Sequence, residues 1–179
     1  MNFDLDASRI RELLDELDRR LSTAGIAAAV YVVGGAAISL HLPDVDRRTQ
    51  DIDGITTDVR VAEIVAQMAD ELGLPEGWLN ARALPFLPPL PADVFTPPDS
   101  PGLRVQLASL ELLLAMKLAA GRARDRADIV TLAMVLRIGP EAAIQLTLET
   151  YGADALEVMT TLADVAYDAR ALIPERPSG

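Results

Sequence analysis

The sequence predicts an α+β fold: a small mixed β-sheet with flanking helices, followed by an α-helical C-terminal half. Two short strand-like runs lie close together in the first third of the chain, an apolar run over 27–33 that a glycine pair ends and a second run over 51–56. From Val105 onward, apolar residues recur instead at helical spacing, with glycines as breaks. A β-sheet buries its apolar face by packing against another layer of secondary structure, and the predicted helices supply that layer.

The N-terminal half alternates helices and strands. A first helix is predicted around Leu13, because apolar residues recur there every three or four positions until Gly25. The continuous apolar run 27–33 is typical of a central buried strand. The other predicted elements of this half are a short helix over 36–41, a polar loop over 44–49, a strand over 51–56 and a helix over 61–72 that Gly73 caps.

Residues 74–102 are rich in proline, which excludes a regular α-helix there. One short strand, Ala92–Phe95, fits between the prolines. Beyond it the pattern predicts helices over approximately 106–121, 125–137, 140–150 and 153–170, and a frayed tail over 174–179. The predicted boundary falls near residue 103, so that 1–103 form the α/β core and 104–179 a helical region packed on it.

Composition excludes several kinds of site. Half of the 179 residues are apolar, which suits one domain or one domain with a helical appendage. The absence of cysteine excludes disulfides, thiolate metal sites and a cysteine nucleophile, and a single histidine, His41, excludes a histidine-rich zinc site. We find no apolar run long enough to span a membrane and no secretory signal, so we expect a cytoplasmic protein.

The net charge of −11 argues against a broad nucleic-acid footprint, because nonspecific binding depends on Lys and Arg side chains that neutralise phosphates. A small anionic ligand held with a metal is compatible with this charge. So are a basic partner protein and a local basic patch that the average hides.

The stretch from Gly34 to Asp53 carries the most specific chemistry. Alternate side chains of a strand share one face, so Asp51 and Asp53 are expected to project together. Adjacent carboxylates repel each other and require a cation, and oxygen ligands suit Mg²⁺ or Mn²⁺. The turn at Gly34 and Gly35 supplies backbone N–H groups at a helix start, where phosphate binds. Together these features predict nucleotide chemistry.

The glycine pair, a short helix, a polar loop with Arg48 and Thr49, and then the Asp-x-Asp pair resemble the signature of the DNA polymerase β-like nucleotidyltransferase superfamily. The resemblance implies a nucleotidyltransferase-like core in which the glycine turn, with Arg48 and Thr49, binds the nucleoside triphosphate. It also implies that Asp51 and Asp53 are catalytic metal ligands, completed by a third acid on a neighbouring strand.

Asp93, in the strand predicted over 92–95, is the candidate for this third catalytic and metal-binding acid. A loop acid before a turn is the alternative interpretation of Asp93, and Asp99 is a less suitable substitute. Three other side chains have two interpretations each. Arg47 can pair with the acids or bind phosphate, Trp78 can pack or stack on a base, and His41 suits a helix end better than a general base.

Lys117 interrupts an apolar helix face, where an ammonium group needs a partner. One interpretation is a lysine at the edge of the core whose amine reaches water. The other is a cation that reaches the triphosphate or the carboxylates of Asp51 and Asp53. Asp125 and Asp128 begin the next predicted helix, where they suit its cap and its dipole.

Lys117, followed by Arg-x-Arg-Asp-x-x-Asp-Ile over 122–129, also resembles small bacterial nucleotidyltransferase-like proteins of toxin–antitoxin and abortive-infection systems. By this resemblance Lys117 is a catalytic residue that contacts the nucleotide phosphates, and Asp125 or Asp128 supports the site. The implied partners are a nucleoside triphosphate, a tRNA end or protein hydroxyl as acceptor, and an antitoxin protein.

The function predicted from these observations is a metal-dependent transfer of a nucleoside monophosphate to such an acceptor. A noncatalytic protein of the same fold, which binds a nucleotide or a protein without turnover, is the alternative.

Overall fold

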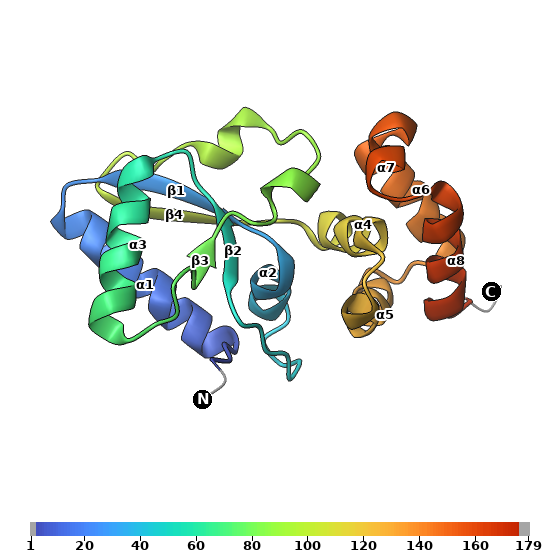
Figure 1. Ribbon diagram of the computed structural model, residues 1–179, viewed down its shortest axis with the longest axis horizontal. Coiled ribbons are helices and arrows are strands. Elements are labelled where there is room, and N and C mark those ends of the chain that lie inside the picture. Colours follow the sequence, from blue (N-terminus) through green and yellow to red (C-terminus); the bar gives the residue numbers. More distant parts are fainter. Residues whose placement is uncertain (1–2, 176–179) are drawn as a thin grey trace. The chain divides into compact units, whose positions relative to one another are not determined.

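The computed structural model describes residues 3–175, which form two compact units. The first, here called the sheet unit, comprises Met1–Pro85 and Pro89–Ala108, and the second, the helical unit, comprises Phe86–Pro88 and Ser109–Gly179. The predicted fold class is confirmed, because a mixed sheet with flanking helices precedes a helical half (Figure 1). Most of the tail predicted over 174–179 lies outside the described residues.

The sheet unit is built on a four-stranded sheet of order β3-β2-β1-β4. Strand β1 is antiparallel to β2 and parallel to β4, and β2 is parallel to β3. The strands are β1 (Ala27–Val32), β2 (Ile52–Ile55), β3 (Leu79–Asn80) and β4 (Gly102–Leu107).

The two strands predicted from the N-terminal half are both present. Strand β1 is central and almost wholly buried, as its continuous apolar run predicts. Strand β2 pairs with it through Tyr31 opposite Ile55 and Val32 opposite Gly54. In β2 the side chain of Ile52 is fully buried and Asp53 is half-buried, but Gly54 and Ile55 are both buried, so the contrast is confined to the first two residues of the strand.

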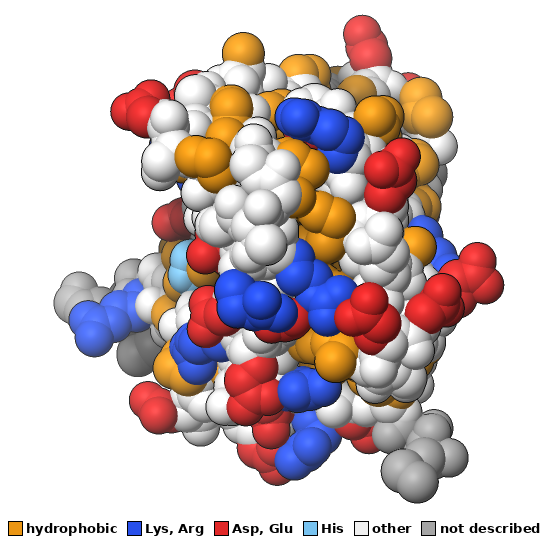
Figure 2. Space-filling view, turned by 90° about the vertical axis from the view of Figure 1, so that its left-hand side faces the viewer, with side chains coloured by type: hydrophobic (Ala, Val, Ile, Leu, Met, Phe, Trp, Pro, Cys, Tyr) orange, Lys and Arg blue, Asp and Glu red, His pale blue; other side chains and the backbone are white. Residues whose placement is uncertain are grey.

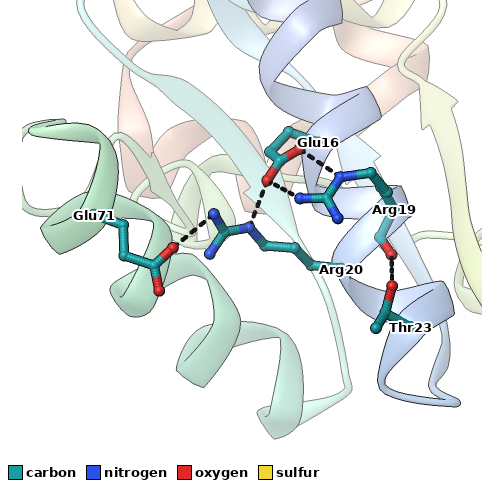
Figure 3. Close-up of polar contacts among 5 residues, drawn as sticks. All are labelled: Glu16, Arg19, Arg20, Thr23 and Glu71. Carbon is teal, nitrogen blue, oxygen red and sulfur yellow. Dashed lines mark hydrogen bonds and ion pairs between the residues drawn. The ribbon is translucent and has the colours of Figure 1, made fainter.

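Helices α1 (Ala7–Thr23), α2 (Gly34–His41) and α3 (Val59–Leu72) complete the sheet unit, and α1 contacts both β4 and α3. Helix α1 begins where the Asp6 carboxylate accepts a hydrogen bond from the backbone N–H of Arg9, and α3 ends at Gly73 in a left-handed conformation. A polar network joins α1 and α3 (Figure 3). In it Arg20 pairs with Glu16 of its own helix and with Glu71 of α3, at 2.7 and 2.8 Å.

Two predictions about the middle of the chain are wrong. Residues Ala92–Phe95 form a 3-10 helix, η2, rather than a strand, because Pro91 before them and Pro97 after them limit the segment to one turn that only Val94 anchors by burial. The helix predicted to start near 106 is preceded by β4, which pairs with β1 along its whole length. Asp18 of α1 holds the start of β4 through a 2.6 Å hydrogen bond from the Leu103 backbone N–H.

The helical unit contains α4 (Leu110–Ala120), a 3-10 turn η3 (Ala123–Asp125), α5 (Arg126–Leu136), α6 (Pro140–Tyr151), α7 (Ala153–Met159) and α8 (Leu162–Leu172). Helix α4 packs against α5 and α6, and α6 packs against α8. The single helix predicted over 153–170 is two helices, because Thr160 is extended and the Thr161 side chain caps α8. Another 3-10 turn, η1 (Leu84–Phe86), lies in the proline-rich stretch.

Within residues 3–175, no single helix is long and apolar enough to cross a membrane. The sharply bent pair Ala123–Leu136 and Pro140–Tyr151 reaches that length and apolarity only when its two members are taken together.

Candidate functional site

The glycine turn joins β1 to α2. Gly34 opens α2 with φ at +61°, a left-handed conformation that residues with a Cβ atom rarely adopt. Val33 lies at the N-cap position in extended backbone, and its apolar side chain provides no cap for the first backbone N–H groups of α2. A helix start of this kind is suited to hold phosphate.

Each glycine of the turn lies against a charged side chain. A Cβ atom at Gly34 would lie 2.6 Å from Asp53 Oδ2, and a Cβ atom at Gly35 would lie 2.6 Å from Arg47 Nη1. Arg47 Nη1 also donates a 3.0 Å hydrogen bond to the carbonyl oxygen of Gly35. Successive glycines thus hold a carboxylate and a guanidinium, and only residues without a side chain leave room for both.

Asn80 connects the positions of the two acids. The register of β2 and β3 pairs Asp53 with Asn80, and residues paired across a sheet project to the same face. Asn80 Nδ2 donates hydrogen bonds of 3.0 Å to Asp51 Oδ2 and to the Gly77 carbonyl oxygen. Asp51, which directly precedes β2, is therefore held beside the strand position of Asp53.

The electrostatics of this cluster are those of a carboxylate pair with cations at its edges. Asp51 is 31% exposed, and Arg82 Nη1 lies 3.8 Å from its Oδ2. The Arg82 side chain is 74% exposed, so water screens this ion pair strongly. Arg47 is less exposed and is fixed on the glycine turn. An anion that approaches the turn would meet Arg47 at close range.

The donor set of Asp51 and Asp53 fits a divalent cation of the magnesium type. Mg²⁺ in proteins is commonly held by one or two carboxylates, with substrate phosphates and water completing the shell. The amide oxygen of Asn80 accepts a 2.9 Å hydrogen bond from the Arg82 backbone N–H, which uses one of its two lone pairs.

The structure does not place Asp93 in a strand. It lies exposed in the first turn of η2, and its carbonyl oxygen accepts a hydrogen bond from Thr96. Asp99 is exposed in a bend. Among residues 3–175, no three Asp, Glu, His or Cys side chains come together in a group that could hold a metal ion. The pair of Asp51 and Asp53 is thus not joined by a third acid in this arrangement.

Residues of the loop before the acids differ in what they contact. The Arg48 side chain is exposed. Thr49 forms an isolated antiparallel bridge with Leu5, and its hydroxyl donates a 3.2 Å hydrogen bond to the Asp51 carbonyl oxygen. Thr49 therefore ties the loop to the entrance of α1 and orients the backbone at the first acid.

Trp78 and His41 have structural contacts. Trp78 is fully buried, and its indole N–H donates to the Val65 carbonyl oxygen at 3.1 Å, which identifies it as a packing residue. His41 ends α2, and its Nε2 lies 2.9 Å from the Ala108 carbonyl oxygen. The helix-end interpretation of His41 is thus the one that its contacts support.

Lys117 finds its anionic partners within the helical unit. Its ammonium group lies 2.5 Å from Asp125 Oδ1 and 3.0 Å from Asp128 Oδ2, and all three side chains are at most 13% exposed. Asp125 occupies the N-cap position of α5, but its carboxylate makes no cap hydrogen bond and instead accepts from Lys117. Asp128 lies in the first turn of α5, where a negative charge matches the helix dipole.

Asn80 is a site residue that was not predicted from the sequence. The prediction for this part of the chain concerned Trp78, whereas the hydrogen bond to Asp51 comes from Asn80. Gln106 was missed with β4 itself. The side-chain Oε1 of Gln106 is buried without a hydrogen-bond partner. In the sheet, Gln106 of β4 pairs in register with Tyr31 of β1.

On the face that Figure 2 shows, acidic and basic side chains are interspersed rather than separated into patches of one sign. The net charge of −11 is therefore not expressed there as a continuous acidic surface.

The comparison with known families bears on this arrangement of glycine turn and acids. The sequence model of a protein family described as "Nucleotidyltransferase of unknown function (DUF6036)" matches residues 8–155. No curated protein and no solved structure matches the chain. The matched residues include the glycine turn, both acids, Asn80 and the Lys117 cluster, and the chain belongs to this nucleotidyltransferase family.

Proposed function

We propose that this protein transfers a nucleoside monophosphate from a nucleoside triphosphate to an acceptor hydroxyl group. The observation that carries the proposal is the close approach of the Asp53 carboxylate to Gly34. It brings an oxygen donor of the kind that Mg²⁺ prefers to a turn suited to phosphate. Membership in the nucleotidyltransferase family supports it.

Asp51 and Asp53 would hold Mg²⁺ or Mn²⁺, and the ion would supply charge neutralisation for the triphosphate and for the leaving pyrophosphate. Asn80 would orient Asp51 through its 3.0 Å hydrogen bond. A role for Asp93 as the third acid would require η2 to rearrange when the nucleotide binds, because Asp93 is exposed in the first turn of this 3-10 helix.

In the reaction, the acceptor oxygen forms a bond to the α-phosphorus and loses its proton to water. The bond from that phosphorus to the bridging oxygen breaks, and pyrophosphate leaves with the electron pair. The backbone N–H groups of Gly34 and Gly35 would hold the triphosphate in line for this displacement. Thr49, whose hydroxyl donates to the Asp51 carbonyl oxygen, would border it. The part proposed for the chain's own residues is thus mainly positioning.

The acceptor class we propose is a tRNA end or a protein hydroxyl, with the protein acting as a component of a toxin–antitoxin system and an antitoxin as its partner. This part rests on the resemblance of the segment from Lys117 to Ile129 to such proteins. A catalytic role for Lys117 would require its ammonium group to leave Asp125 and Asp128, to which it is now bound.

The test uses the four nucleoside triphosphates labelled at the α-phosphate, with total tRNA or total cell protein as acceptor and with or without Mg²⁺. Label should pass to one acceptor class only with the metal, and Asp53→Asn should abolish the transfer. Asp44→Asn, which removes an exposed acid from the preceding loop, is the matched control and should transfer label normally. Absence of transfer with every nucleotide and both acceptor classes would contradict the enzymatic proposal.

A noncatalytic function is the second candidate, and one observation favours it: among residues 3–175 no third acid joins Asp51 and Asp53. Such a protein would bind a nucleoside triphosphate without turnover. Thermal shift measurements combined with the label-transfer assay separate the two candidates, because ligand binding raises the melting temperature whether or not chemistry follows. Nucleotide-dependent stabilisation without label transfer would support the noncatalytic candidate.

A further inference from the structure

Arg47 is the cation that the fold places on the glycine turn. Its Nη1 and Nη2 atoms lie 2.6 and 2.7 Å from the point where a Cβ atom of Gly35 would be. The Cζ atom lies farther away, at 3.0 Å, so the guanidinium points its Nη edge at Gly35, where a side chain would exclude it. A 3.0 Å hydrogen bond from Nη1 to the carbonyl oxygen of the same residue, Gly35, fixes this position.

From this position we infer that Arg47, rather than Arg48, is the arginine that binds the phosphates of the nucleotide. This inference rests on the proposed function. It assigns to Arg47 the recognition of the phosphate groups of the nucleotide. A guanidinium is always charged and offers five N–H donors in a planar fork that matches phosphate oxygens. Phosphate bound at the start of α2 would lie within reach of that fork.

The neighbouring carboxylate makes such a cation necessary. Asp53 Oδ2 lies against Gly34, so a phosphate at this turn approaches a negative charge as well as the backbone N–H groups of the helix. A positive charge on the adjacent glycine reduces this repulsion, and its partial burial strengthens the interaction relative to bulk water.

Arg48 is a matched control that the chain itself supplies. It is the next residue, carries the same charge, and its side chain is exposed, whereas Arg47 is half-buried on the turn. Arg48 contacts Arg47 through its backbone, because its carbonyl oxygen accepts a hydrogen bond from the Arg47 side chain. Neutralising Arg48 therefore changes the net charge as neutralising Arg47 does but leaves the contact at Gly35 intact.

The experiment measures the dissociation constants of the intact protein by titration calorimetry with Mg²⁺ present. The probes are inorganic tripolyphosphate, the nucleoside triphosphate that binds wild type best, and the corresponding nucleoside. Arg47→Gln should raise the dissociation constants of both phosphate-bearing probes by about tenfold or more, the scale of one charge-assisted contact. Arg47→Lys should restore part of the loss, and Arg48→Gln should stay within about twofold of wild type, the scale of an exposed charge.

The affinity for the nucleoside and the urea unfolding curve show whether Arg47 acts in phosphate binding or in folding. If Arg47 contacts phosphate, Arg47→Gln leaves the affinity for the nucleoside unchanged. If Arg47 only supports the loop, the variant loses nucleoside and triphosphate binding alike and unfolds at lower urea, which would overturn the inference. Equal losses in Arg47→Gln and Arg48→Gln would also overturn it. Wild type that binds no triphosphate would instead refute the proposed function itself, and the inference with it.

Discussion

Lys117 of α4 and Asp125 of η3 form a buried ion pair, with 2.5 Å between the ammonium nitrogen and Oδ1, and Asp128 contacts the same ammonium group at 3.0 Å. The other carboxylate oxygen of Asp125 is buried without a hydrogen-bond partner. One ammonium group thus balances two carboxylates where α4, η3 and α5 meet. Removing it leaves two negative charges away from water.

We therefore predict that Lys117→Met destabilises the protein by about 3–5 kcal/mol, the range for loss of one partner of a buried ion pair. Urea unfolding followed by circular dichroism measures this. The triple variant with Asp125→Asn and Asp128→Asn should recover much of the loss, because it removes the charges that Lys117 balances. A Lys117→Met protein as stable as wild type, but with impaired nucleotide transfer, would instead support a catalytic role.

Gly34→Ala should cost more stability than a comparable glycine substitution elsewhere. Alanine at φ +61° is strained by about 1–2 kcal/mol, and its Cβ would also lie 2.6 Å from Asp53 Oδ2, which must move. Gly73 is the control, since it has φ +64° and nothing within 4 Å of the added atom. Gly73→Ala should show the strain alone. Equal unfolding free energies for the two variants would show that the contact with Asp53 contributes nothing.

Asn80→Asp should place a third carboxylate beside Asp51, where an amide now donates a hydrogen bond. The variant loses this bond and gains like-charge repulsion, so we expect it to be less stable than wild type at pH 7 by about 1–3 kcal/mol. Millimolar Mg²⁺ should raise the melting temperature of the variant more than that of wild type. If Mg²⁺ stabilises both proteins equally, the added acid does not join a metal site.

Glu16 makes the stability of the sheet unit dependent on pH. Hydrogen bonds from Arg19 and Arg20 lower the pKa of Glu16 from 4.5 to about 2. Because the pKa is depressed on folding, the stabilisation is fully present above pH 4.5 and is lost as the pH falls from 4.5 toward 2. Its size should be about 1 kcal/mol or less, since Arg19 is 64% exposed and water screens its charge.

Glu16→Gln tests this dependence. The variant should be less stable than wild type at pH 7, and the difference should shrink as the pH falls toward 2, where wild-type Glu16 is itself half protonated. Glu63→Gln, an exposed acid of α3, serves as the control. A stability difference for Glu16→Gln that stays constant between pH 7 and pH 2 would contradict the assignment.

Much of the candidate site is readable in the sequence because its signals are local. An apolar run that ends in paired glycines predicts a buried strand and a tight turn, and β1 and Gly34 have these properties. The spacing of Asp51 and Asp53 predicts a shared environment, and their common neighbour Asn80 lies next to both. Metal binding by these acids remains a prediction.

Other features depend on contacts between residues far apart in the chain. Strand β4 has too few residues for periodicity to distinguish it from a helix start, and its pairing with β1 and the hydrogen bond from Leu103 to Asp18 decide its conformation. The segment 92–95 has the composition of a strand, yet the prolines at 91 and 97 and the burial of Val94 produce a 3-10 turn.

The sequence by itself determined the fold class, the helical periodicities, the glycine turn and the pair of acids, because each depends on the chemistry of neighbouring residues. Only the tertiary structure decided which partners the polar and charged side chains take. It placed Arg47 on Gly35, Asn80 on Asp51, and Lys117 on Asp125 and Asp128. The physical reason is that a hydrogen-bond donor or an ion binds whichever acceptor or opposite charge the packed backbone brings within about 3 Å, and sequence spacing does not encode that distance.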